Sequence, residues 1–511
     1  MPLTQRLIFA ALSGVLLAAA FPPYHLPYFL PLAVTALLKA LEGATPRQGF
    51  YIGVLSSGIH TGATLFWLAN LFASAVVPLC AIVAFFPILF CTLWPWLASP
   101  RAARDPLRRV SRFAGAKGVM AAVFWVGLEF YRAELFALNF GWSTLGYCVA
   151  GRPVFTPLAA SFGVYGISFL AFFLGTLKGR ALALATTLWA VACVVPLSAP
   201  QPERPLRVLL VQAYGDEEAL FKLSAPPVGA AGLPSVASSA TKGVPPMKNP
   251  HGPKGPSQPQ ARQSPRSHRG DEDLEVILWP EHAFHSDPRV PGKLKFENYW
   301  PRLQALAQKN NAHLIFGAHV ATGADSDKQY ENSAFVLNPQ GELIGVHAKN
   351  HPVHFVTDGI ASQTAKAIPT TLGRLGVPIC FDNDYPEVDR RLVQDGAEVL
   401  LVPNMDPNEW GSVQHAQHSL LFAMRAMENG RWLARADVDG GTSAVAPNGV
   451  EIAHVKNGEP QTLKVTLGRT SHQTLYSLGG WIFGPLCLIG AVSVVVFSCA
   501  RRVFNKRAPV E

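Results

Sequence analysis

The chain has 511 residues, of which 49% are hydrophobic and only 15% are charged, against about 25% charged in an ordinary soluble domain. This deficit excludes a wholly soluble or wholly disordered protein and predicts that much of the chain lies in lipid. The net charge of +9 would suit a nucleic-acid partner, so the positions of the basic residues must decide whether such a partner is expected. Six of the seven cysteines lie in or beside apolar runs, and no CxxC pair offers a zinc site.

Eight apolar runs are candidate membrane spans. The first two come from one stretch without formal charge, residues 7–38, which Pro22, Pro23 and Pro27 divide. Five more follow at residues 50–72, 74–99, 114–131, 154–177 and 181–197. The last, residues 478–499, is long enough for a bilayer of about 30 Å at about 1.5 Å per residue. We therefore expect a transmembrane domain of seven spans over residues 1–198 and an eighth span after a long polar region.

The basic residues gather in alternate loops. Inner segments, if the N-terminus is inside, are residues 1–6, 39–49, 100–117, 178–180 and 500–511. These segments hold 15 Lys and Arg residues, whereas the outer loops between spans hold only Arg132 and Arg152. This positive-inside pattern predicts cytoplasmic termini and an outer location for residues 200–477. Because the basic residues are spread over short loops, no nucleic-acid partner is expected.

The outer region has the pattern of an α/β domain, residues 206–470. Strand-like runs and helix-like runs alternate in it, which is typical of layered α/β folds. The expected strands are residues 207–212, 274–280, 313–320, 376–380 and 397–403, with hairpins at 332–348 and 435–455 and helices at 300–310 and 412–430. Residues 224–270 are rich in Pro, Gly and Ser and lack acidic and aromatic residues, which predicts a disordered insertion. This insertion is expected to replace the first helix of the domain.

Three polar residues follow predicted strands and form a chemically complete set. Cys380 offers a nucleophile, and a nearby cation would favour its thiolate. Glu281 can take the thiol proton and later return it, if its surroundings raise its pKa. Lys349 can face the tetrahedral oxyanion together with the backbone N–H of Phe381. Each residue alone is weak evidence, and only the joint pattern favours a site of nucleophilic catalysis.

The sequences around these residues resemble the three signatures of the nitrilase superfamily: WPEHAF around Glu281, HAKNH around Lys349 and ICFDNDYPE around Cys380. Nitrilases are soluble, whereas this domain lies between seven expected spans and one. That arrangement is similar to the apolipoprotein N-acyltransferase family. The membrane half also follows this family's pattern at Trp125, Glu129, Arg132, Asn139, Gly141, Trp142, Leu145, Gly146 and Tyr147.

The resemblance implies a fold and a reaction. The outer domain would be an α-β-β-α sandwich, with Glu281, Lys349 and Cys380 as its catalytic triad. By resemblance, Cys380 takes an acyl chain from a phospholipid and passes it to the N-terminal amine of an S-diacylglyceryl-cysteine apolipoprotein, in a ping-pong scheme of lipoprotein biosynthesis. The protein would lie in the cell inner membrane with its catalytic domain in the periplasm. No cofactor and no metal are expected, and His415 and His418, three apart on a helix, are interpreted as a polar pair.

The chain departs from the family pattern beside the lysine. The family carries a Glu eight residues after it, where this chain has Thr357. Asp358 comes one residue later with a shorter arm, and we expect it to be a poor replacement. Asp382 keeps a carboxylate after the nucleophile, so Asp358 and Asp382 are second-line site residues. Two alternatives stay open: a membrane-tethered amidase, in which water hydrolyses the same thioester, and a non-catalytic lipoprotein-binding homologue.

Overall fold

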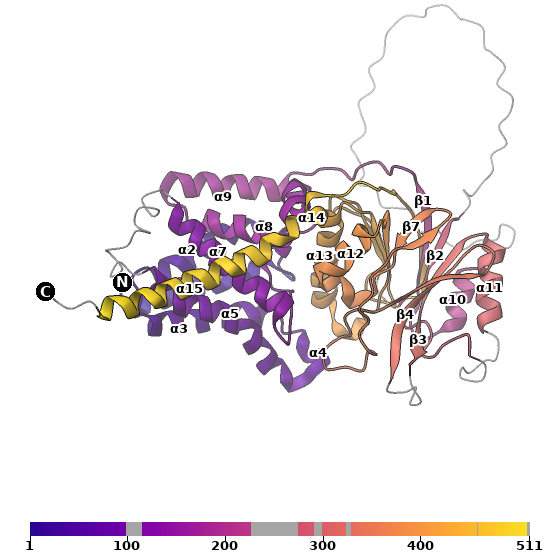
Figure 1. Ribbon diagram of the computed structural model, residues 1–511, viewed down its shortest axis with the longest axis horizontal. Coiled ribbons are helices and arrows are strands. Elements are labelled where there is room, and N and C mark those ends of the chain that lie inside the picture. Colours follow the sequence, from indigo (N-terminus) through magenta and orange to yellow (C-terminus); the bar gives the residue numbers. More distant parts are fainter. Residues whose placement is uncertain (99–114, 226–273, 291–298, 323–328, 457, 508–511) are drawn as a thin grey trace, which may run out of the picture.

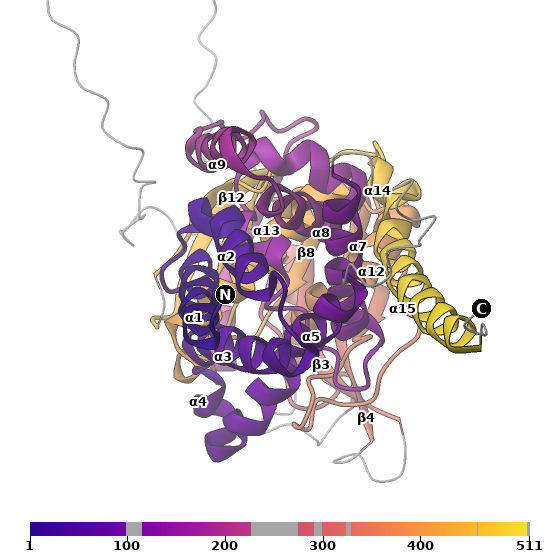
Figure 2. The same ribbon diagram turned by 90° about the vertical axis from the view of Figure 1, so that its left-hand side faces the viewer.

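The computed structural model describes residues 1–98, 115–225, 274–290, 299–322, 329–456 and 458–507. Nearly all of the insertion expected at 224–270 and most of the basic segment 100–117 lie outside these residues. The chain forms an elongated body with a helical domain at one end and a two-sheet sandwich domain at the other (Figure 1). The N-terminus and the end of the last helix both lie at the end of the helical domain that is remote from the sheets, on different sides of it (Figures 1 and 2).

Eight helices of the helical domain correspond in order to the eight expected spans. They are α1 (Leu3–Ala20), α2 (Leu30–Leu41), α3 (Pro46–Thr64), α5 (Val76–Leu97), α7 (Ala116–Phe130), α8 (Thr156–Gly175), α9 (Gly179–Val194) and α15 (Phe483–Arg507). Only four segments of the described chain are long and apolar enough to cross a membrane: Leu3–Ala20, Leu68–Leu97, Pro153–Gly175 and Gly480–Ala500. The protein is therefore a membrane protein, but the expected count of eight full spans is not reached on length and composition.

Small residues let these helices approach one another closely. A Cβ atom at Gly49 of α3 would collide with the Cys91 carbonyl of α5, and one at Gly53 would lie 2.8 Å from the Ile88 Cα atom. The last helix packs in the same way, because a Cβ at Gly127 of α7 would lie 2.7 Å from the Cys487 carbonyl of α15. Such small-residue contacts are typical of helix packing in membranes. Figure 2 shows α15 running along the flank of the helical domain beside α7.

The sandwich domain consists of two six-stranded sheets. The order in the first sheet is β12-β1-β2-β3-β4-β5, and in the second it is β11-β10-β9-β8-β7-β6. The first sheet contains β1 (Leu206–Gln212), β2 (Val276–Leu278), β3 (His313–Ala321), β4 (Tyr330–Leu337), β5 (Leu343–Ala348) and β12 (Gln461–Leu467). The second contains β6 (Ile368–Thr370), β7 (Gly373–Gly376), β8 (Val399–Pro403), β9 (Leu433–Ala436), β10 (Ser443–Val445) and β11 (Glu451–His454). The buried faces of the two sheets pack together through apolar side chains, as in other sheet sandwiches.

Two helices cover each outer face, so the expected α-β-β-α class is confirmed. Helices α10 (Glu217–Leu223) and α11 (Tyr299–Asn310) lie against the first sheet, and α12 (Pro386–Gln394) and α13 (Ser412–Asn429) lie against the second. Helix α13 also packs on α8 of the helical domain. There Glu428 Oε1 accepts a hydrogen bond of 2.7 Å from Val164 N, beside a kink where Gly163 has a φ of 67°. The two domains therefore share a polar, buried interface.

Two predicted strand boundaries were wrong, and one helix that was expected to be absent is present. The strand expected at 376–380 ends at Gly376, and Cys380 instead begins the short 3₁₀ helix η7 (Cys380–Asp384). The strand expected at 274–280 is only Val276–Leu278, because its continuation turns toward the site. The first helix of the domain is present as α10, which Asp216 caps by accepting a hydrogen bond from Ala219 N. Helix α12 and strand β12 were not anticipated.

Candidate active site

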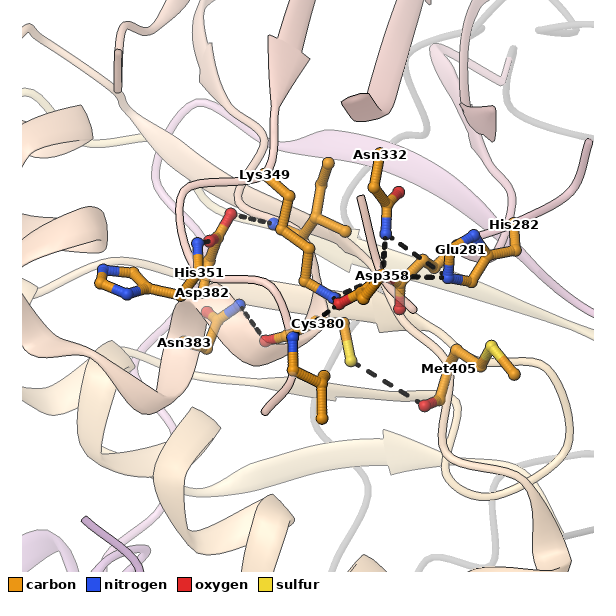
Figure 3. Close-up of polar contacts among 12 residues, drawn as sticks. Glu281, His282, Asn332, Lys349, His351, Asp358, Cys380, Asp382, Asn383 and Met405 are labelled. Atoms are coloured by element: carbon orange, nitrogen blue, oxygen red, sulfur yellow. Dashed lines mark hydrogen bonds and ion pairs between the residues drawn. The ribbon is translucent and has the colours of Figure 1, made fainter. Parts of the chain in front are cut away.

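The structure brings Glu281, Lys349 and Cys380 together (Figure 3). Glu281 follows β2 and Lys349 follows β5, so both come from the first sheet, whereas Cys380 follows β7 of the second sheet. The exposed fractions of these residues are only 1%, 1% and 3%. Side chains from three distant segments thus meet at one end of the sandwich, as the alignment of the strand ends predicted.

Lys349 lies between two carboxylates. Its Nζ atom donates to Glu281 Oε1 and to Asp358 Oδ2, both at 2.7 Å. Asn332 of β4 ties the same carboxylates together, because its Nδ2 donates to Glu281 Oε1 at 2.6 Å and to Asp358 Oδ1 at 2.8 Å. Asp358 also accepts from the backbone N–H of Val353 at 2.9 Å. The ammonium group is therefore held in one place by charged hydrogen bonds, which are the stronger kind.

The electrostatics of the site keep Lys349 charged and the thiol neutral. Burial lowers the pKa of Lys349, but Asp358 and Glu281 outweigh it, so the pKa lies well above its usual value. Burial acts to raise the pKa of Asp358, yet the Lys349 ammonium holds it far below the ordinary range. Burial, and then the Glu281 carboxylate, raise the pKa of the Cys380 thiol well above normal. The Cys380 thiol is therefore neutral, and Glu281 is the carboxylate beside it.

Cys380 sits in a strained turn. Its φ is 44°, in the left-handed region, which costs a residue other than glycine about 1–3 kcal/mol. Asp382 holds this turn, because its Oδ2 accepts from Ile379 N at 3.1 Å and its Oδ1 accepts from Asn350 N and His351 N, both at 2.9 Å. The side chain of Asn383 donates to the Cys380 carbonyl at 3.2 Å. The turn after the nucleophile is thus joined to the loop after Lys349.

The second-line residues occupy distinct places. Asp382 is fully buried and binds backbone amides under the cysteine. Asp358 contacts Lys349 directly, so its displacement by one residue does not prevent the contact, while the side chain of Thr357 is exposed. Phe381 is the second residue of η7, where the first amides of a helix have no carbonyl partner within it. Its N–H therefore has no acceptor within η7.

The thiol faces an apolar cavity of about 100 Å³. The helical domain supplies part of its wall, including Leu68, Phe72 and Val83, and the sandwich domain supplies Val353, Phe355 and Phe381. The rings of Phe72 and Phe355 meet edge to face at 5.9 Å across the two domains. Cys380 thus borders a space suited to hydrocarbon.

A polar cluster also lines this cavity, and the sequence indicated only its His418, as half of a polar pair with His415. His418 Nδ1 lies 2.6 Å from Asp406 Oδ2, and its Nε2 lies 3.1 Å from Asp384 Oδ1. Burial lowers the pKa of His418, but the Asp406 and Asp384 carboxylates outweigh burial and raise it to about 9. His415 Nε2 instead lies 3.0 Å from the Pro407 carbonyl, so the two histidines do not face a common ligand. Asn332 was also missed, because only the strand register places it beside Glu281.

Comparison with known proteins identifies both parts of the chain. Residues 13–177 match the model of the apolipoprotein N-acyltransferase N-terminal domain, and residues 270–475 match that of carbon-nitrogen hydrolase. An apolipoprotein N-acyltransferase from Geobacter metallireducens is 26% identical, with 97% of this chain and 95% of the relative covered. Nearly the whole chain is thus similar to the apolipoprotein N-acyltransferases. Another apolipoprotein N-acyltransferase, from Shewanella oneidensis, is 24% identical, with 95% of each chain covered.

Among solved structures, the sandwich domain is similar to a carbon-nitrogen hydrolase from Helicobacter pylori. That structure is 18% identical and has a TM-score of 0.37, covering 52% of this chain and 89% of the other. An amidase from Nesterenkonia sp. is also 18% identical, with a TM-score of 0.37, 55% of this chain covered and 95% of the other.

Proposed function

We propose that this protein transfers an acyl chain from a phospholipid to the N-terminal amine of an S-diacylglyceryl-cysteine apolipoprotein, through a thioester on Cys380. The observation that carries the proposal is the cavity at Cys380, because its apolar wall is built from both domains. A soluble amide substrate would not require a wall from the helical domain. An acyl chain that arrives from a membrane would be stabilised by it through apolar burial.

In the first half-reaction, the Cys380 sulfur attacks the carbonyl carbon of the phospholipid ester. Glu281 takes the thiol proton, as the neutral resting thiol requires. The carbonyl oxygen becomes an oxyanion, which faces the Lys349 ammonium and the Phe381 N–H; such groups act most strongly where water is excluded. The tetrahedral intermediate then collapses, the ester C–O bond breaks, and Glu281 returns the proton to the leaving lysophospholipid oxygen. The acyl chain stays on sulfur as a thioester.

In the second half-reaction, the free α-amine of the apolipoprotein attacks the thioester carbonyl. Glu281 takes a proton from this amine, and the same oxyanion contacts form. Collapse breaks the C–S bond, the sulfur takes the proton from Glu281, and the acyl chain becomes an amide. Because an amide is more stable than an ester or thioester, the overall transfer runs forward without a nucleotide.

The orientation in the membrane follows from the charges. We place the protein in the cell inner membrane, with the sandwich domain in the periplasm and both termini in the cytoplasm. The basic segments of the sequence and the position of both ends of the described chain, remote from the sandwich, support this orientation. The cavity would then open near the outer leaflet, where both lipid-anchored substrates lie.

The test uses the full chain in detergent or vesicles with an acyl-labelled phospholipid and a diacylglyceryl lipopeptide. We expect a labelled thioester on the protein and then a labelled lipopeptide amide. Cys380→Ala should abolish both products, whereas Cys499→Ala, which removes an exposed cysteine of α15, should leave both unchanged. Free fatty acid as the main product would instead indicate a hydrolase. Absence of any thioester would indicate a non-catalytic binding protein.

A further inference from the structure

A cluster of three histidines lies beside the active site, outside the residues to which the reaction assigns a role. His282 and His285 lie in the loop after β2, and His319 lies in β3. Each offers a ring nitrogen, and these ligand atoms all lie within 4.8 Å of one another. We propose that this three-histidine site binds a transition-metal ion of the Zn²⁺ class.

The backbone holds the three ligands in place. Phe284 N donates to the Gly317 carbonyl at 3.1 Å, and His319 N donates to the Phe284 carbonyl at 3.2 Å. These two hydrogen bonds fix the loop against β3 between the positions of its two histidines. The His319 ring is further held by stacking on Tyr330, with ring centroids 4.1 Å apart. A site whose ligands are already positioned does not have to order them when the ion binds.

The distances suit an ion with only a small adjustment. His282 Nδ1 lies 2.5 Å from His319 Nε2, whereas two nitrogens on a tetrahedral zinc ion, each about 2.0–2.1 Å from it, stand about 3.3 Å apart. Rotation of the two rings would open this gap. His285 is exposed, so an ion can enter from solvent, and a water molecule can complete the coordination.

The other nitrogen of His282 lies near two carboxylates and 3.4 Å from Asn332 Nδ2. Its Nε2 lies 3.5 Å from Asp358 Oδ1 and 3.6 Å from Glu281 Oε1. A ligating imidazole commonly donates its second N–H to a carboxylate, which fixes the ring and its tautomer. This leaves Nδ1 of His282 directed at His319 as the ligand atom.

The donor set defines the class of ion. Three neutral imidazoles suit Zn²⁺, Co²⁺, Ni²⁺ or Cu²⁺, whereas Mg²⁺ and Ca²⁺ prefer oxygen ligands. Glu281, His282 and Asp358 form a second group of close ligand atoms, but its two carboxylates already bind the buried Lys349 ammonium. The imidazole group is therefore favoured. The ion would join the loop that carries Glu281 to β3 and would not take part in acyl transfer.

The experiment measures zinc binding to the full chain in detergent, purified through a tag that contains no histidine. Equilibrium dialysis with Zn²⁺ should give one ion per chain. His285→Ala and His319→Ala should each lower the zinc affinity at least about tenfold, because removal of a residue that only hydrogen-bonds to a metal ligand already costs about tenfold to 100-fold. His454→Ala is the matched control, because His454 is an exposed strand histidine paired with Glu451. This variant should bind zinc as the unaltered chain does.

Two further readouts separate binding from folding. Zn²⁺ should raise the thermal unfolding temperature of the unaltered chain, since a ligand of the native state stabilises it, and this rise should be lost in His285→Ala, whose side chain is exposed. Co²⁺ should give the visible absorption of a tetrahedral ion, and Mg²⁺ should have no effect. The proposal is overturned if the unaltered chain binds no zinc. It is equally overturned if both histidine variants bind zinc unchanged, since the ion would then lie on the carboxylates.

Discussion

Asp358 offers the sharpest test of the site, because it stands one position away from the residue that the family pattern predicts. Its carboxylate receives three short hydrogen bonds: from Lys349 Nζ at 2.7 Å, from Asn332 Nδ2 at 2.8 Å and from Val353 N at 2.9 Å. Asp358→Asn keeps the size of the side chain but replaces one oxygen with an NH₂ group. At least one of the three donors then faces another donor.

The expected loss follows from the hydrogen bond to the ammonium. A hydrogen bond to a charged group contributes about 1.5–3 kcal/mol, and the burial of Lys349 shields it from bulk solvent. If this contact holds Lys349 where the oxyanion forms, its loss reduces the rate by about tenfold to about 150-fold, at about 1.4 kcal/mol per factor of ten. Asp358→Glu restores the charge on a longer arm and should recover part of the rate.

The assay is single-turnover formation of the thioester on Cys380, followed by steady-state acyl transfer. Thr357→Ala is the control, because the Thr357 side chain is exposed and should be dispensable. If Asp358→Asn keeps the unaltered rate, the carboxylate contact does not support the reaction. If Thr357→Ala loses as much activity as Asp358→Asn, the loss has another cause than the carboxylate contact.

Three other predictions concern the same region. Cys380 should react only slowly with iodoacetamide at neutral pH, because burial and then Glu281 raise its pKa well above the usual value; rapid alkylation in a mass-spectrometric time course would contradict this. Asp382→Asn should lower the unfolding temperature and slow thioester formation, because the Asp382 carboxylate accepts three backbone N–H groups. An unsatisfied buried donor costs about 1–3 kcal/mol. An unchanged unfolding temperature and unchanged kinetics would show that Asp382 does not position the turn. His418 has its pKa raised from 6.5 to about 9 in the fold, so its protonated form stabilises the fold fully below about pH 6.5 and loses this effect as the pH rises through about 9. The stability advantage of the unaltered chain over His418→Gln should therefore shrink between these pH values in a melting series, and an advantage that grows with pH would oppose the assignment.

The sequence was informative where a residue follows a strand. Glu281, Lys349 and Cys380 each follow a β-branched or apolar run, and the ends of neighbouring strands meet in a layered α/β fold. Their approach was therefore predictable from one chain. The exact strand end before Cys380 was not, because Val377, Pro378 and Ile379 continue the apolar pattern although the strand pairing stops at Gly376.

What could not be predicted depends on pairing between strands. Asn332 reaches Glu281 only because β4 pairs with β3, where Asn332 lies opposite His319. The same register, together with the backbone contacts of Phe284, brings His282 and His285 to His319. Strand β12 did leave a signal, since exposed polar residues alternate with partly or fully buried residues along Gln461–Leu467. Its partner β1, however, lies more than two hundred residues earlier.

Because both domains line the cavity at Cys380, separating the sandwich domain from the membrane helices should change the reaction. A sandwich domain expressed without the helices would keep the thiol, the carboxylate and the ammonium, since all three come from its own strands. It would lose Leu68, Phe72 and Val83 from the cavity, and water would reach the acyl-enzyme from that side. Severing the chain would therefore turn a transferase toward hydrolysis, which makes the membrane helices part of the chemistry and more than an anchor.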